Sequence, residues 1–150
     1  MKAFGRARVQ DPARELRAAL EGRSILCVSD DRYVLGMRKQ LLKAFGCFVL
    51  TADGTRAIAV LKDHTVDAMV LDCRSPATDA GLWAINLRMA RPQAPLLMVG
   101  KDPVAVSDSL KKIVSLVLPG NVSSAALLQA LASCLQHRRA RALFLGRAAG

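Results

Sequence analysis

The stretch that decides the fold is "DAMVLDCRSP", residues 67–76, in which a short apolar run ends at Asp72 and a proline follows. Consecutive apolar residues between polar ends predict a strand that is buried on both faces, as in parallel sheets. A similar run, "SILCV" at 24–28, is followed by a serine and then by Asp30 and Asp31. Because sites in parallel sheets form at the carboxyl ends of the strands, these three acids are candidate site residues.

Outward from these two runs, strand-like and helix-like segments alternate along the chain. The expected strands are 24–28, 47–52, 67–71, 95–99 and 113–118, and the expected helices are 32–46, 54–64, 81–90, 103–112 and 123–139. We therefore predict an α/β fold, a doubly wound (βα)₅ parallel sheet. An extra N-terminal helix is expected at Asp11-Pro12, because aspartate caps helices and proline suits the first turn.

The composition fits one globular domain, with 52% hydrophobic and 23% charged residues in 150. We expect a basic extension with a short helix at 1–23, the main domain at 24–137 and a basic tail at 138–150. No apolar run reaches the length of a membrane span, and the N-terminus lacks the apolar core of a signal peptide. Four cysteines without a CxxC pair predict reduced, buried thiols. These features favour a cytoplasmic protein without a membrane partner.

The net charge of +10 is concentrated at the two ends of the chain. Residues 137–150, for example, contain four arginines and no acidic residue. Arginine-rich ends leave nucleic-acid binding open as an alternative function, with a steep salt dependence as its signature. Basic ends are more often solvated, so nucleic acid is not the expected partner.

In their order, the segments over about residues 24–136 resemble the receiver domain of bacterial two-component response regulators. "ILCVSDD" resembles the first strand with its acidic pair, and "DAMVLDCRSP" resembles the third strand with its phosphoacceptor and proline. "PLLMVG" and "LVLPG" resemble the fourth and fifth strands. The resemblance implies a flavodoxin-like fold with strand order 2-1-3-4-5. It also implies that Asp72 is the phosphoacceptor and that Asp30, Asp72 and the backbone carbonyl of Arg74 form a Mg²⁺ site.

Four positions depart from the receiver pattern. Ser29 replaces the second acid of the pair, Gly100 replaces a hydroxyl residue, Leu118 replaces a lysine, and Ser115 replaces an aromatic switch residue. The losses predict weak Mg²⁺ binding with no other cofactor, impaired phosphorylation at Asp72 and a broken switch. Arg74 or Lys101 could act as a compensating cation by pairing with Asp72.

The expected function is therefore that of a degenerate, pseudo-receiver-like signalling module in a two-component phosphorelay. It is expected to be no enzyme and to act by contacts with a sensor kinase or another signalling protein, and a homodimer is compatible with the sequence. A conventional Mg²⁺-dependent receiver stays open as an alternative. A phosphohydrolase with an aspartate nucleophile is disfavoured, because Arg74 stands where such an enzyme has its second acid.

Overall fold

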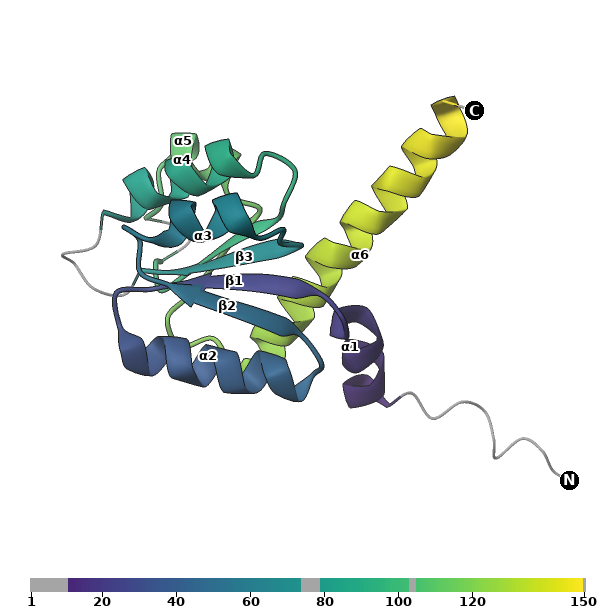
Figure 1. The fold of residues 1–150 in the computed structure, drawn as a ribbon, viewed down its shortest axis with the longest axis horizontal. Coiled ribbons are helices and arrows are strands. Elements are labelled where there is room, and N and C mark those ends of the chain that lie inside the picture. The colour runs from purple at the N-terminus through teal and green to yellow at the C-terminus, as the bar shows by residue number, and fades with distance from the viewer. Residues whose placement is uncertain (1–10, 74–78, 103–104, 150) are drawn as a thin grey trace, which may run out of the picture.

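The computed structural model describes residues 11–73, 79–102 and 105–149, with side chains described as far as residue 137. The strands are β1 (Ser24–Val28), β2 (Phe48–Ala52), β3 (Ala68–Asp72), β4 (Leu96–Val99) and β5 (Leu116–Leu118). The helices are α1 (Pro12–Leu20), α2 (Arg32–Ala44), α3 (Ala57–Asp63), α4 (Ala80–Ala90), α5 (Asp108–Ile113) and α6 (Ser124–Ala149). All strand pairs are parallel and the order is β2-β1-β3-β4-β5, which confirms the predicted flavodoxin-like sheet (Figure 1).

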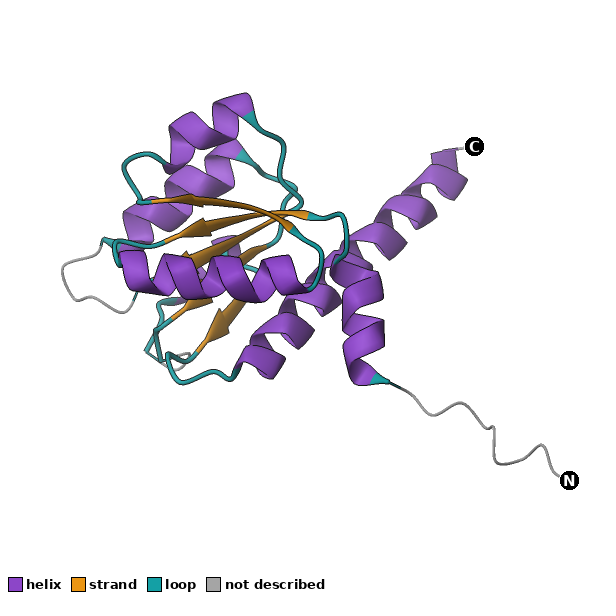
Figure 2. Cartoon of the chain, turned by 60° about the horizontal axis from the view of Figure 1, so that its bottom comes forward, coloured by secondary structure: helices purple, strands orange, loops and turns teal. Residues whose placement is uncertain are grey.

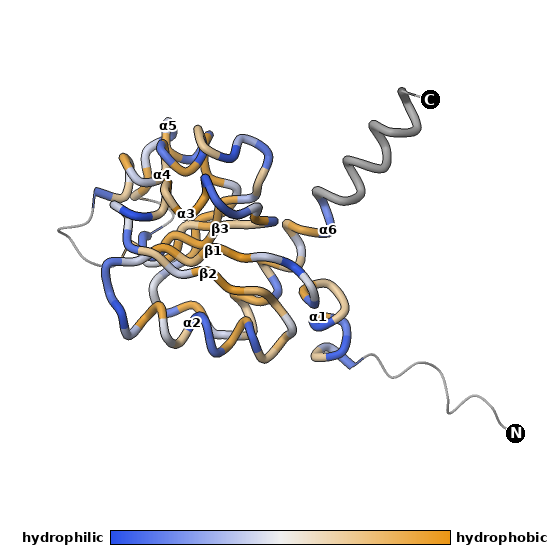
Figure 3. The backbone as a smooth tube through the Cα atoms, in the orientation of Figure 1, coloured by the Kyte–Doolittle hydropathy of each residue, from blue (hydrophilic) through white to orange (hydrophobic). Residues whose placement is uncertain are grey.

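Helices cover both faces of the sheet, as Figures 1 and 2 show. One core cluster lies between the sheet and α3, α4 and α5, and it includes Leu61 and Leu87. The second lies between the sheet and α1, α2 and α6, and it includes Leu20, Leu42 and Leu131. Figure 3 shows apolar strands inside the fold and hydrophilic stretches in connections between the elements. The extra helix α1 is therefore part of the packed fold, because it buries Leu20 in this second cluster.

The alternation of side chains along β3 determines toward which face of the sheet the Asp72 side chain points. Met69 and Leu71 belong to the cluster under α3–α5, whereas Ala68 and Val70 belong to the cluster under α2 and α6. Because side chains alternate along a strand, Asp72 follows Ala68 and Val70 toward the α2 face.

Helix starts are set by capping side chains, as the sequence predicts for the first helix. Asp11 accepts hydrogen bonds from the backbone N–H groups of Ala13 and Arg14, at 3.1 and 3.3 Å. Helix α5 begins at Asp108, later than expected, because the hydroxyl of Ser107 caps it by accepting from Leu110 N at 3.2 Å. The first residues of the expected 103–112 helix, 103 and 104, lie outside the described residues.

Strand β5 is shorter than expected, and Ser115 lies just before it. The Ser115 hydroxyl accepts a hydrogen bond from Leu96 N at 3.0 Å. Nearby, the guanidinium of Arg88 donates to the carbonyls of Ile113 and Ala94, at 2.8 and 2.7 Å. Burial lowers the pKa of Arg88. Arg88 therefore joins the end of α4, the turn after it and the end of α5.

A tight contact joins α4 to the loop that follows β2. A Cβ atom placed on Gly54 would lie 1.8 Å from an atom of the Trp83 ring. Real side-chain atoms cannot approach so closely, so the ring packs directly on the glycine backbone. Trp83 is the single tryptophan of the chain.

Helix α6 crosses the expected boundary between domain and tail at 137/138. Its first half buries Leu127, Leu131 and Leu135 against the sheet. Its second half continues as helix to Ala149 and leads away from the sheet (Figure 1). No helix in the part of the chain that the structure describes is long and apolar enough to cross a membrane.

Candidate functional site

A buried ion pair lies at the carboxyl end of β3. Asp72 Oδ2 accepts a hydrogen bond from Arg38 NH2 at 3.1 Å, and only 4% of the Asp72 side chain and 7% of the Arg38 side chain are exposed. Arg38 reaches the pair from α2, on the face toward which the alternation of β3 directs Asp72. Arg38 Nε is buried and has no hydrogen-bond partner among the described residues. The candidate phosphoacceptor is therefore covered by a helix and neutralised by its cation.

Two buried thiols lie near this pair. Burial raises the pKa of Cys27 to about 12, while the nearby charge of Arg38 opposes this rise and that of Asp72 adds to it. Burial likewise raises the pKa of Cys73 to about 11, and Lys101 opposes that rise whereas Asp72 and Asp30 add to it. The charges of Asp30, Asp72 and Lys101 thus all act on the Cys73 thiol.

In the turn after β1, Asp31 and Ser29 both have structural roles. Asp31 caps α2 by accepting from Tyr33 N and Val34 N, at 2.9 and 3.4 Å. Ser29 is 2% exposed, and its hydroxyl accepts from Asp31 N at 3.1 Å. Asp30 and Asp31 are both exposed, whereas Ser29 is buried. Ser29 therefore supports the turn with its hydroxyl and supplies no charge.

The three positions near β4 and β5 that depart from the receiver pattern each have a structural role. Gly100 has a φ of 107° and its N–H donates to Leu118 O at 3.0 Å. This conformation is strained for a residue with a side chain, so a threonine would not fit here without a backbone change. The Leu118 side chain is half-buried and packs against the core on the α2 and α6 face. Ser115 lies at the opposite end of β5, where its hydroxyl bonds Leu96.

Of the two expected compensating cations, only Lys101 lies among the described residues. Arg74, together with its carbonyl, lies outside the described residues. Lys101 is half-buried and close enough to Cys73 to oppose the rise in its pKa. The cation that pairs with Asp72 in the described structure is Arg38, which sequence reasoning missed.

The signal for Arg38 is present in the sequence. Val34 and Leu42 are the buried residues on either side of it in α2, at spacings of four. A cation in the middle of an i, i+4, i+8 stripe that is otherwise apolar must be buried with a partner. Asp72 is the partner that the strand order makes available.

The described donors do not fit a tight magnesium site. Mg²⁺ requires several oxygen ligands in near-octahedral geometry, usually including carboxylates. Asp72 already faces the guanidinium of Arg38, Asp31 caps a helix, and no group of three or more His, Cys, Asp or Glu residues that could hold a metal occurs among the described residues. Asp30 and Asp31 are the exposed carboxylates that follow β1 at this edge.

Comparisons with known proteins agree on the fold. No protein-family model matches the sequence, and no curated protein matches it. Among solved structures, a response regulator receiver protein from Sinorhizobium medicae is 26% identical, with a TM-score of 0.63, covering 79% of this chain and 98% of that chain. The chemotaxis protein CheY4 of Vibrio cholerae is 22% identical, with a TM-score of 0.65, covering 75% of this chain and 98% of that chain.

A third structure was determined with ligands. The response regulator protein TrrA of Thermotoga maritima, in complex with Mg²⁺ and BeF, is 18% identical, with a TM-score of 0.66, covering 75% of this chain and 98% of that chain. The expected resemblance to receiver domains is thus confirmed at the level of the fold.

Proposed function

We propose that this chain, which has the receiver-domain fold, is a receiver-like module of a two-component system whose phosphorylation at Asp72 is impaired. It acts through contacts with a sensor kinase or another signalling protein and carries out no enzymatic reaction of its own. The observation that supports impairment is the buried Asp72–Arg38 ion pair. Free, buried cysteines at 27, 47 and 73 support a reducing compartment such as the cytoplasm.

Phosphoryl transfer to a carboxylate requires that one of its oxygens reach the phosphorus atom in line with the leaving group. Asp72 is 3% exposed, and its Oδ2 faces Arg38. For Oδ2 to react, it would have to leave Arg38, and the guanidinium would then remain buried without its counter-ion. This cost is added to the barrier of the transfer. Access to the other oxygen is limited by the burial of the whole side chain.

The residues that usually lower the barrier are also changed. Leu118 supplies no cation for the developing charge, and Gly100 supplies no hydroxyl for the phosphoryl oxygens. Ser29 removes one carboxylate from the magnesium site, so any Mg²⁺ bound at Asp30 is held weakly. Weak Mg²⁺ binding is therefore part of the proposal.

The test is phosphorylation by acetyl phosphate in the presence of Mg²⁺, measured by intact-mass spectrometry. We expect no phosphate adduct on the natural chain. The triple variant Ser29→Asp/Arg38→Val/Leu118→Lys, which frees Asp72 and restores two charges, is expected to gain an adduct. A stoichiometric adduct on the natural chain that disappears in Asp72→Asn would show a conventional receiver instead.

A further inference from the structure

The sheet has an open edge at β2, which pairs only with β1. Phe48 N donates to Arg23 O at 2.8 Å, and Ala52 O accepts from Ser29 N at 3.1 Å, so both ends of β2 bond toward β1. In a parallel ladder alternate residues bond to the same neighbour. The N–H and C=O groups of Val49 and Thr51 therefore point to the open edge.

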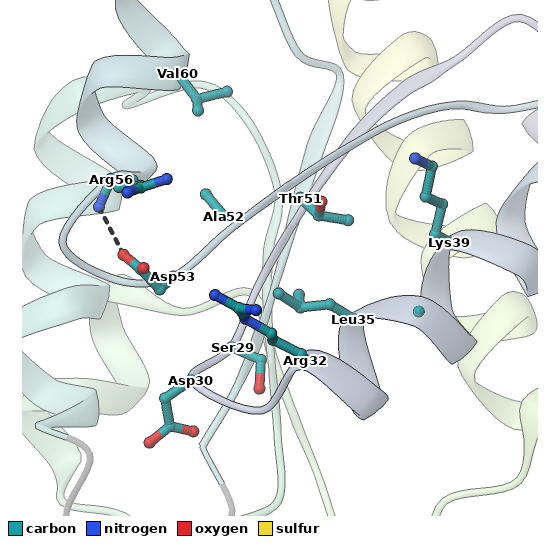
Figure 4. Close-up of a pocket in the computed structure, with 11 residues that line it drawn as sticks. Ser29, Asp30, Arg32, Leu35, Lys39, Thr51, Ala52, Asp53, Arg56 and Val60 are labelled. Atoms are coloured by element: carbon teal, nitrogen blue, oxygen red, sulfur yellow. Dashed lines mark hydrogen bonds between the residues drawn. The ribbon is translucent and has the colours of Figure 1, made fainter.

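Two adjoining hollows follow this edge between α2 and α3. One, of about 520 Å³, is lined by Thr51 and Ala52 at the carboxyl end of β2, and the other, of about 640 Å³, is lined by residues 47–50. Lys39 lines both of them, so the two hollows adjoin at this side chain, and we call the pair the edge groove. Figure 4 shows the part of it where Thr51 and Ala52 lie between Lys39 of α2 and Arg56, the residue before α3.

The walls of the edge groove are unequal in charge. The α2 wall presents Arg32, Lys39 and Lys43, which are all exposed and lie seven and four residues apart, on one side of the helix. Among the described residues, none of these cations, nor Arg56 on the opposite wall, forms a salt bridge with an acid. The acidic residues that line the groove are Asp30, Asp53 and Asp63.

Asp53 is already engaged by its own loop. Its carboxylate accepts from the Thr55 hydroxyl at 2.6 Å and from Arg56 N at 3.0 Å, and the hydrogen bond from Thr55 is the main reason why its pKa is lowered. Asp30 lies at the end of the groove next to β1, and Asp63 lies at the other end. The α2 wall along the strand is therefore basic without interruption.

The groove also has an apolar anchor point. Phe48, at the amino end of β2, is 67% exposed although it belongs to a strand. Large exposed aromatics beside unpaired strand groups favour contact with another chain. β2 has no proline or charged residue, which are the usual protection of an open edge.

We propose that the edge groove binds an extended, acidic peptide segment of a partner protein, which adds to the sheet as a strand beside β2. Main-chain hydrogen bonds to Val49 and Thr51 would hold the segment, and alternate acidic side chains would face the α2 wall. The proposal deepens the proposed function by giving the chemistry of a partner, but it does not depend on Asp72.

Charge argues against the other occupants of the edge groove. Residues 1–10 contain Lys2, Arg6 and Arg8 and no acid, so the chain's own N-terminus would be repelled by the α2 wall. A second copy that paired β2 with β2 would bring two basic α2 walls together. An acidic partner is the occupant that complements the groove.

The test uses a fluorescein-labelled peptide of alternating glutamate and valine and measures its binding to the full chain by fluorescence anisotropy. The variant Lys39→Glu/Lys43→Glu reverses two charges of the α2 wall. The matched control, Lys111→Glu/Lys112→Glu, makes the same change on α5, where both lysines are exposed. We expect the first variant to weaken binding at least about tenfold, which corresponds to about 1.4 kcal/mol, and the control to change it less than about twofold.

A backbone variant tests strand addition directly. Thr51→Pro removes an N–H that points to the open edge and leaves the hydrogen bonds to β1 in place, whereas Thr51→Val keeps it. We expect Thr51→Pro to lose peptide binding and Thr51→Val to retain it. Should Thr51→Pro fail to fold by circular dichroism, amide chemical shifts of Val49 and Thr51 in the natural chain must move on addition of peptide.

The proposal is overturned if a lysine–valine peptide binds equally well, or if both charge-reversed variants bind like the natural chain. It is also overturned if inorganic phosphate displaces the peptide with no amide shift on β2, which would indicate a simple anion site. Binding must survive in Asp72→Asn. The phosphate-adduct experiment and this one can therefore fail independently.

Discussion

Replacing Asp72 by asparagine removes the negative charge of the buried pair and keeps the shape of the side chain. At 3.1 Å, with an effective dielectric constant of about 20, the lost attraction is about 5 kcal/mol. The amide oxygen of the new side chain could still accept one hydrogen bond from Arg38, which recovers part of this. Because the guanidinium stays buried without a counter-ion, we expect a loss of about 3 kcal/mol in the free energy of unfolding.

The measurement is urea denaturation followed by the fluorescence of Trp83. Glu21→Gln is the matched control, because it removes one charge from the exposed Arg17–Glu21 pair, whose atoms are 3.4 Å apart. Exposed pairs of this kind contribute less than about 1 kcal/mol, so the control should stay close to the natural chain. The double variant Arg38→Met/Asp72→Asn should recover most of the lost stability, because it replaces both charges.

The test depends on whether Asp72→Asn lowers or raises the free energy of unfolding. If Asp72 belonged to a cluster of mutually repelling acids, its neutralisation would relieve repulsion and raise stability. A neutral or stabilising Asp72→Asn would therefore refute the buried pair and, with it, the main support for impaired phosphorylation.

Three further predictions concern other parts of the fold. Gly54→Ala should cost about 2 kcal/mol and shift the Trp83 emission, because a Cβ at Gly54 would collide with the ring; an unchanged urea midpoint would contradict this packing. Cys27 has a folded pKa of about 12 against an ordinary value of 9.0, so its contribution to stability is complete below pH 9 and is lost as the pH rises toward 12. In Cys27→Ala, the free energy of unfolding from urea titrations should fall less steeply between pH 9 and 12. An equally steep fall in the variant would argue against the contribution of Cys27. In a Mg²⁺ titration, the changes in amide chemical shifts should not reach saturation below about 1 mM, and they should disappear in Asp30→Asn. Saturation at a lower concentration would show a tight magnesium site.

The fold was predictable because the signals that define it are local. Uninterrupted apolar runs, helix spacing and the Asp11 cap each depend on a few neighbouring residues, and the parallel direction of the strands follows from their alternation with helices. The boundaries of α5 and β5 were less predictable, since the hydrogen bonds of Ser107 and Ser115 decide where these short elements begin.

The candidate site was predictable only in part. Asp72 and Asp30 could be placed at one edge because strand ends are visible in the sequence. The partner of Asp72 comes from α2, 34 residues earlier, and was overlooked because arginine is normally assigned to the exposed side of a helix. The strain at Gly100 depends on a backbone angle that no sequence pattern of one residue reveals.

The arrangement around Arg88 has a consequence for the order in which the molecule opens. Helix α5 has six residues and buries none of its side chains completely, and the guanidinium of Arg88 holds its last carbonyl. The free energy of local opening is lowest where few apolar contacts hold a segment. Amide protons of α5 should therefore exchange with deuterium well before those of β1 and β3. In Arg88→Gln, the amide exchange of α5 should become faster while that of the central strands stays the same. The Arg88 side chain would then determine how often α5 opens from the rest of the fold.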